Sequence, residues 1–178
     1  MKINFKTLFS FILFGTAASI LSGFVFFGTN VFNLRSPLFQ FLSFGVVGSV
    51  SFALFRANRL RDVIFANVLF FLILFIASGN RFFLTRLFYF AVVVFSVFAY
   101  SEWVYPKLQS LKLVRPLILA GFFAICFLLV TLILTVLYHT KAMHVLPFRN
   151  MPIGFLIGLG LGIGFEISEY VIQKGVGK

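Results

Sequence analysis

Apolar residues fill six stretches of this chain, and short polar segments separate them. A helix needs about 20 predominantly apolar residues to cross the hydrocarbon core of a bilayer, and each stretch approaches or reaches that length. The pattern therefore predicts an all-α membrane protein, a bundle of about six transmembrane helices that forms one domain over residues 1–178. The expected spans are residues about 8–28, 37–55, 63–78, 87–105, 117–138 and 152–173.

Composition supports a membrane protein over a soluble one. The 178 residues are 61% hydrophobic and only 11% charged, with a mean hydropathy of +1.10. Soluble domains carry about 25% charged residues, so this chain falls outside their range. Six spans with short connections leave no room for a separate soluble domain. We interpret the 29 phenylalanines mainly as lipid-facing bulk.

Basic residues near the ends of the spans predict the orientation, because cytoplasmic loops of membrane proteins are enriched in Lys and Arg. The larger group would face the cytoplasm, so both chain ends would lie on the cytoplasmic side of a bacterial cytoplasmic membrane. The larger group of basic residues consists of Lys2, Lys6, Arg56, Arg59, Arg61, Lys107, Lys112, Arg115, Lys174 and Lys178. The smaller group, on the other side, consists of Arg35, Arg81, Arg86, Lys141 and Arg149.

The net charge of +11 would favour nucleic acid as a partner in a soluble protein. Here the basic residues stand singly or in small groups at the ends of apolar runs, where anionic lipid headgroups bind them. We therefore expect the lipid bilayer as one partner, and further membrane subunits or a second copy of the chain as others. Nucleic acid is not an expected partner.

The last apolar stretch is rich in glycine. On a helix, Gly154, Gly158 and Gly162 fall along one stripe, and Gly160 and Gly164 lie on roughly the opposite side. Small residues allow two helix backbones to approach closely in a membrane. The spacing predicts that this span is packed tightly on two sides.

Carboxylates within apolar stretches are the leading candidates for a site. Glu166 continues the first glycine stripe and Glu169 falls on the same side. A charge at the centre of a membrane helix costs about 2.5–3.5 kcal/mol on insertion scales, so these groups must be paired, hydrated or protonated. They either tie the helix to an arginine elsewhere or form a proton, ion or substrate site. Further candidates are Asp62, Glu102 and Asn67, and the threading places all four acidic residues in the cytoplasmic half.

Few other residues offer chemistry. His139 and His144 stand five apart, about 140° around a helix, so we expect ordinary interfacial histidines, although one histidine suffices as an axial ligand to haem or a chlorin. Cys126 has no second cysteine for a disulfide or a cysteine-based metal site. Trp103 and Tyr105 suit an interfacial aromatic belt. We expect no metal and no cofactor.

No catalytic constellation accompanies these features: the chain lacks G-x-S-x-G and has one aspartate. We favour a small membrane protein of transport type, a solute-binding or permeating subunit. The alternative is a non-catalytic structural or assembly subunit of a larger membrane complex, and a membrane enzyme comes third. Glu166 separates the first two, since it would serve transport in one and an ion pair in the other.

Overall fold

The computed structural model describes residues 5–27, 37–57, 59–78, 83–108, 113–137 and 146–176. These residues contain helices and no strand, so the predicted all-α class is confirmed. The elements are α1 (Phe5–Phe27), α2 (Pro37–Arg56), α3 (Leu60–Ser78), α4 (Phe83–Ala99), the π-helix η1 (Tyr100–Val104), α5 (Val114–Leu137) and α6 (Leu146–Val176).

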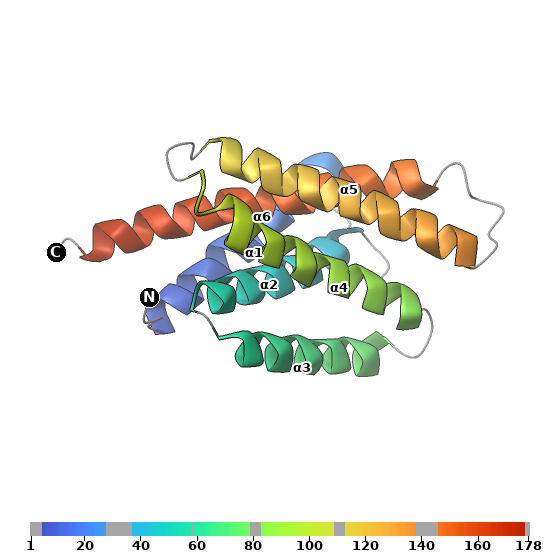
Figure 1. Cartoon of the computed structure of the whole chain (residues 1–178), viewed down its shortest axis with the longest axis horizontal. Coiled ribbons are helices and arrows are strands. Elements are labelled where there is room, and N and C mark those ends of the chain that lie inside the picture. The colour runs from blue at the N-terminus through green and yellow to red at the C-terminus, as the bar shows by residue number, and fades with distance from the viewer. Residues whose placement is uncertain are drawn as a thin grey trace.

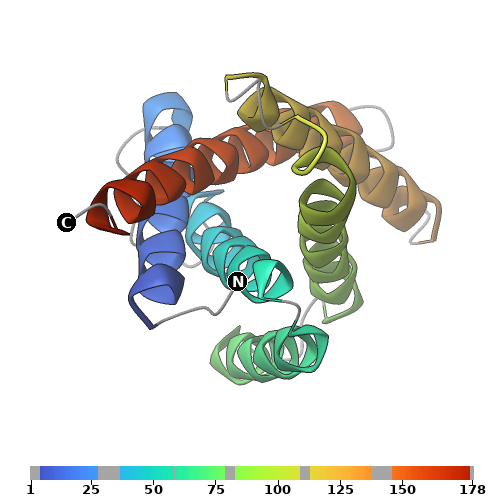
Figure 2. The ribbon, with the colours of Figure 1, turned by 60° about the vertical axis from the view of Figure 1, so that its left-hand side comes forward.

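The helices run along one bundle, and the start of α1 and the end of α6 lie at the same end of it (Figure 1). The most extensive contacts join α6 to α5 and to α1. The next layer is α2, which packs against α1, α4, α3 and α6. Figure 2 shows α6 crossing over α1 and α3 set apart at the edge of the bundle. Thus α6 is the central helix, and α3 is peripheral.

Length and apolar character make a membrane the natural solvent for this bundle. Four helical segments of the described residues are long and apolar enough to cross a bilayer, and Gln40–Arg56 adds a shorter apolar helix. Large apolar side chains cover the outside, and Ile76 on α3 is 80% exposed. Exposing such an apolar surface to water is unfavourable, whereas exposing it to the hydrocarbon core of a bilayer is not. These features indicate a membrane protein. The four segments are Lys6–Val25, Leu87–Val104, Val114–Leu137 and Asn150–Lys174.

Five helices begin earlier than the expected spans, and the starts of α6 and α5 bear on the site. The helix α6 starts at Leu146, so Pro152 lies inside it and does not open it. Proline removes only one backbone hydrogen bond there, and the preceding turn is held by the side chain of Asn150, which is hydrogen-bonded to α4 and α5. The helix α5 starts at Val114, so Arg115 belongs to a helix and not to the preceding loop.

The fourth helix ends in a π-turn. The Tyr105 N–H donates to the Tyr100 carbonyl at 2.9 Å, which widens the last turn. On a regular α-helix, two residues five positions apart point about 140° away from each other around the helix axis. The π-turn instead brings the Tyr100 and Tyr105 rings together, with their centres 6.1 Å apart. Trp103 is 56% exposed and fits the predicted belt, whereas Tyr105 is 4% exposed. The belt interpretation is therefore wrong for Tyr105.

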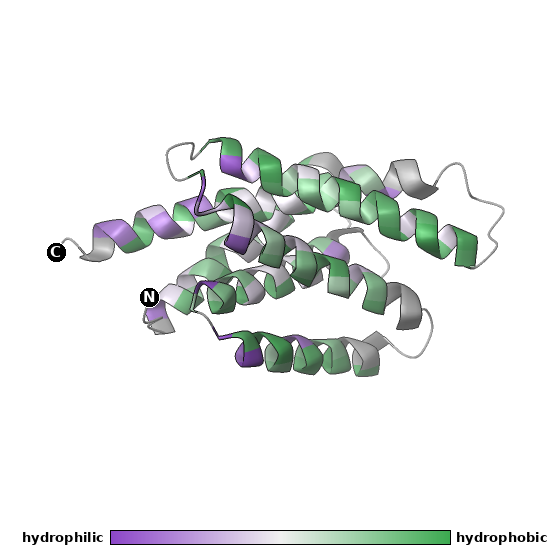
Figure 3. Cartoon of the chain, in the orientation of Figure 1, coloured by the Kyte–Doolittle hydropathy of each residue, from purple (hydrophilic) through white to green (hydrophobic). Residues whose placement is uncertain are grey.

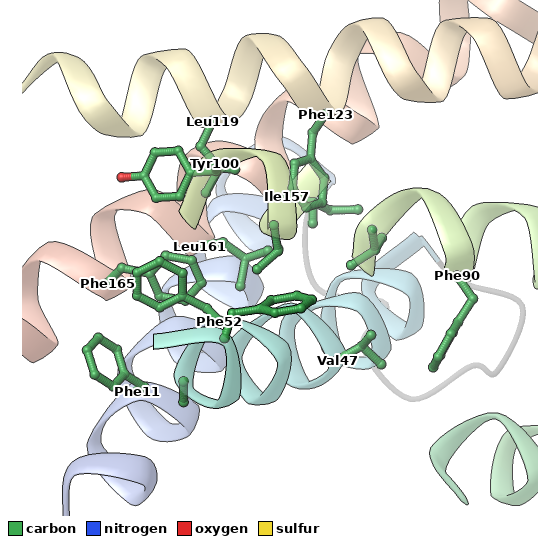
Figure 4. Close-up of a cluster of buried hydrophobic side chains, with 14 of the residues drawn as sticks. Phe11, Val47, Phe52, Phe90, Tyr100, Leu119, Phe123, Ile157, Leu161 and Phe165 are labelled. Carbon is green, nitrogen blue, oxygen red and sulfur yellow. The ribbon is translucent and has the colours of Figure 1, made fainter. Parts of the chain in front are cut away.

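An aromatic core supports this turn. Figure 4 shows Phe52 of α2 and Phe165 of α6 lying together near Tyr100, and their rings stack at 3.9 Å. Phe11 of α1 packs edge-on to Phe52 at 5.4 Å. The Phe52 ring also contacts both tyrosines of the π-turn. Several phenylalanines therefore form the core, whereas others, such as Phe65 at 71%, are exposed on the outside of the bundle.

Candidate functional site

Glycines on one side of α6 allow α5 to approach at backbone distance. A Cβ atom on Gly158 would lie 2.8 Å from the Ala120 Cα, and one on Gly162 would lie 2.6 Å from the Pro116 Cα. Gly154 meets Phe123 and Phe127 in the same way. Any larger residue on this stripe would push the two helices apart.

The opposite side of α6 meets α1 just as closely. A Cβ on Gly160 would come 2.6 Å from the Ser19 Cα, and one on Gly164 would come 2.5 Å from the Gly15 Cα. The Ser168 hydroxyl donates to the Ser10 carbonyl of α1 at 3.1 Å. Backbone contact on two sides fixes the rotation of α6 about its axis, and this rotation determines where Glu166 and Glu169 lie.

Glu166 lies at the interface of α6 with α5. Its Oε2 accepts a hydrogen bond from Arg115 Nη2 at 2.8 Å. The Arg115 side chain is 2% exposed, and Arg115 is the largest fully buried residue of the described chain. A guanidinium buried in this way requires a carboxylate partner, because an unpaired buried charge is strongly unfavourable.

Glu169 lies one turn further along α6, where α2 ends. Its Oε1 is 3.6 Å from Arg56 Nη2, and the side chains are 17% and 30% exposed respectively. This pair is longer and more accessible than the Arg115–Glu166 pair. The two glutamates of α6 therefore contact arginines of two different helices.

Tyr105 joins the two ion pairs. The Arg56 Cζ lies 4.2 Å and the Arg115 Cζ 4.6 Å from the centre of its ring, both within the range of a cation–π contact. Because Tyr105 follows the π-turn, the geometry of that turn positions the ring against both cations. The charge cluster is defined by Arg56, Arg115, Glu166, Glu169, Tyr100 and Tyr105, and the formal charges of its arginines and glutamates cancel.

The remaining predicted site residues lie outside the charge cluster. Asp62 is exposed at the start of α3, 3.5 Å from Arg59, and Glu102 is exposed on η1. Asn67 donates to the Ser51 hydroxyl at 2.9 Å and to the Val63 carbonyl at 2.8 Å, so it fastens α3 to α2. The start of α3, the turn η1 and the last turns of α6, which carry the four acidic residues, nevertheless lie at the same end of the bundle (Figure 1), where hydrophilic residues gather (Figure 3).

Metal and cofactor chemistry find no further support in the described residues. His139 and His144 lie outside them. Within them, no group of three or more His, Cys, Asp or Glu side chains could hold a metal ion. Cys126 is a free, half-buried thiol on α5.

A second polar group, uncharged, connects α4, α5 and α6 at the other end. Asn150 Nδ2 donates to the Tyr89 hydroxyl at 2.9 Å and to the Thr131 Oγ1 at 3.1 Å. The Thr131 hydroxyl itself donates to the Phe127 carbonyl, so Tyr89 is the donor in its 2.6 Å contact with Thr131. The polar triad of Tyr89, Thr131 and Asn150 thus joins α4, α5 and α6 through neutral hydrogen bonds.

Sequence reasoning missed the partners of the glutamates and the polar triad. Arg115 counted as a loop residue, although the sequence VRPLILAG has the form of a helix start with proline in its first turn. The tyrosine pair gave no signal because its spacing of five separates the rings on an α-helix. A scan against known protein families, a search of curated proteins and a search of solved structures each found no match to this chain.

Proposed function

We propose that the chain is a small multi-pass protein of the bacterial cytoplasmic membrane, of transport type, and that its charge cluster belongs to the path of a solute or ion. The observation that carries the proposal is that two arginines, each paired with a glutamate of α6, both lie over the ring of Tyr105 within an apolar bundle. Ionisable residues inside membrane segments are expensive, and they commonly mark substrate and ion pathways.

The proposed threading has both chain ends in the cytoplasm. The start of α1 and the end of α6 share one end of the bundle (Figure 1). The described charged side chains belong to that end, whereas Arg86 and Arg149 stand in the first turns of α4 and α6 at the other. The excess of basic residues at the first end supports its cytoplasmic location.

Stability alone gives little reason for the charge cluster. Replacing a buried ion pair by well-packed apolar residues is often neutral or stabilising, so holding α5 and α6 together does not require charge. Glycine contacts already join these helices. The cluster also adjoins a π-turn, a feature that occurs frequently at functional sites. Each point favours a role for the charges beyond packing.

The charge cluster and the polar triad form two polar layers, one on each side of the apolar middle of the bundle. From Asn150 to Glu166 the helix α6 rises about 24 Å at ~1.5 Å per residue, close to the hydrocarbon thickness of a bilayer. Between the layers, the buried hydroxyls of Thr16, Ser49 and Ser96 have no hydrogen-bond partner within the described residues. In the transport proposal, the charge cluster and the polar triad close the two ends of a path along these hydroxyls.

A structural subunit is the second candidate, and a specific observation favours it. The exposed apolar face of α3, which includes Phe65 at 71% and Ile76 at 80%, leaves a helix that its own bundle hardly covers. A larger complex would cover that face with other subunits, and the charge cluster would then serve only as a set of structural ion pairs.

Accessibility of the bundle interior tests the two candidates. In a Cys126→Ala background, Ser96→Cys places a thiol at a fully buried position of α4 between the two polar layers. A membrane-impermeant thiol reagent is applied to inside-out vesicles and to spheroplasts. Transport predicts labelling from both sides, since a path must open to each in turn. Absence of labelling from both sides would reject transport and favour the structural subunit.

The control for this test is Arg61→Cys in the same background. Arg61 is exposed at the proposed cytoplasmic end, so the thiol should react only in inside-out vesicles. Reaction only in spheroplasts would show that the threading is inverted.

A further inference from the structure

Three buried hydrogen-bond donors in the charge cluster have no acceptor within the described residues. They are the Nε atoms of Arg56 and Arg115 and the hydroxyl of Tyr100. Arg115 is 2% exposed and Tyr100 is fully buried. A buried donor left without an acceptor costs about 1–3 kcal/mol, and more when it is charged. The protein therefore keeps three costly groups in one region.

These donors lie around the same pair of rings. Both guanidinium groups lie over the Tyr105 ring, at 4.2 and 4.6 Å, and the Tyr105 ring contacts the Tyr100 ring at 6.1 Å. The donors come from α2, α5 and η1, so three elements of different sequence position contribute donors around the Tyr100 and Tyr105 rings. Such convergence is typical of a site for a bound group.

We propose that the charge cluster binds a small oxyanion, of carboxylate or phosphate type, and takes up one proton with it. This inference rests on the proposed transport function and names the class of its substrate. A carboxylate supplies only acceptors and a phosphate supplies mainly acceptors, which matches a set of donors, whereas a water molecule would bring two hydrogens of its own. The planar guanidinium fork suits carboxylate and phosphate oxygens, and its charge repels cations.

Charge balance requires the proton. The arginines and glutamates of the cluster cancel, so an added singly charged anion, such as acetate or dihydrogen phosphate, would leave one net negative charge in a buried place, which is unfavourable. A proton on Glu169 restores neutrality. Glu169 is the acceptor because its 3.6 Å contact with Arg56 is longer than the 2.8 Å contact of Glu166 with Arg115.

The groups facing Glu169 are known for each element packed against α6. Arg56 of α2 pairs with Glu169 itself, and Arg115 of α5 pairs with the neighbouring Glu166. Tyr100 of η1 interacts electrostatically with both glutamates, whereas the acidic side chain of η1, Glu102, is exposed. The described part of α1 carries one titratable side chain, Lys6, and it is exposed. No other charge of these elements therefore replaces the proton on Glu169.

Calorimetry of the full chain in nanodiscs of neutral lipid tests the proposal. Sodium acetate and inorganic phosphate are titrated separately, each in two buffers of equal pH and different ionisation enthalpy. The expected result is binding of at least one of these anions with uptake of about one proton per anion. The probe that binds distinguishes a carboxylate substrate from a phosphate one. If neither acetate nor phosphate gives a heat of binding, or if an anion binds without proton uptake, the proposal is overturned.

Three variants assign the binding to the charge cluster. Tyr100→Phe removes one donor and should weaken anion binding about tenfold or more, the usual effect of a hydrogen bond to a charged group. Glu169→Gln should retain anion binding and lose the proton uptake. Arg61→Gln changes an exposed charge at the same end of the bundle and should alter neither. Equal binding by wild type and Tyr100→Phe would place the anion elsewhere and overturn the assignment.

This experiment is separate from the labelling of Ser96→Cys. Anion binding without labelling from both sides would reject transport but keep the oxyanion site. Labelling from both sides without anion binding would reject only the oxyanion site.

Discussion

Gly164 of α6 and Gly15 of α1 meet backbone to backbone, since a Cβ on Gly164 would lie 2.5 Å from the Gly15 Cα. This contact fixes the rotation of α6 from the side opposite α5. Glu166 and Glu169 follow within two turns, so the contact also determines how they face Arg115 and Arg56. Packing and the chemistry of the charge cluster are therefore coupled through one helix.

Gly164→Ala should destabilise the protein by about 1–3 kcal/mol, the usual cost of overpacking a tight contact. The added methyl group meets backbone atoms, which cannot rotate away. The midpoint of thermal unfolding in detergent gives the measurement. The matched control is Gly121→Ala on α5, where a Cβ meets nothing within 4 Å, so its midpoint should stay equal or rise. Equal losses in both variants would contradict the role of the close contact.

Glu166→Ala should lower stability by about 3–5 kcal/mol, because it leaves the buried Arg115 guanidinium without its carboxylate. The double variant Arg115→Met, Glu166→Leu should recover most of this loss, since apolar residues of similar volume can replace an ion pair. The single variants Arg115→Met and Glu166→Leu, measured together with the double variant and the wild type, form a cycle that isolates the pair. Additive effects would show that the two side chains do not interact.

Tyr105→Leu should cost about 1–2 kcal/mol of stability, because it removes the ring under both guanidinium groups. Tyr105→Phe retains the ring face and should stay close to wild type. Comparing the two variants by their unfolding midpoints separates the ring from the hydroxyl. A loss in Tyr105→Phe as large as in Tyr105→Leu would assign the effect to the hydroxyl.

Tyr89→Phe should lower stability by about 1 kcal/mol, since Asn150 loses one of its two acceptors. Tyr170→Phe is the matched control, because Tyr170 is 57% exposed near the end of α6. The expected order of unfolding midpoints is wild type and Tyr170→Phe together, with Tyr89→Phe below them. Equal midpoints in all three proteins would show that the polar triad contributes nothing to stability.

The sequence was sufficient to predict the all-helical class, because twenty-residue apolar runs leave few alternatives. It was not sufficient to predict the helix starts at Val114 and Leu146, since prolines stand near both and proline is compatible with a first turn as well as with a loop. Helix boundaries depend on tertiary contacts of the first turn, such as those of Asn150.

The candidate site, too, could be predicted from the sequence only in part. Helical spacing suffices to place Glu166 and Glu169 on one side of their helix, because both belong to one regular element. Their partners come from two other helices, and the sequence contains no local signal for such pairing. The π-turn is a departure from regular geometry, so a periodic pattern cannot predict that Tyr100 and Tyr105 come together.

The central helix α6 follows its packing partners in the chain, so the bundle lacks its centre until α6 has been synthesised. Its neighbours α1 and α5 precede it in the chain, and its hydrogen bonds reach back to Ser10 and Ser22 near the start. Until the ribosome has delivered α6 to the membrane, Arg115 and Arg56 lack the carboxylates that neutralise them. A chain that ends before Glu166 therefore keeps both arginines without the carboxylates that neutralise them.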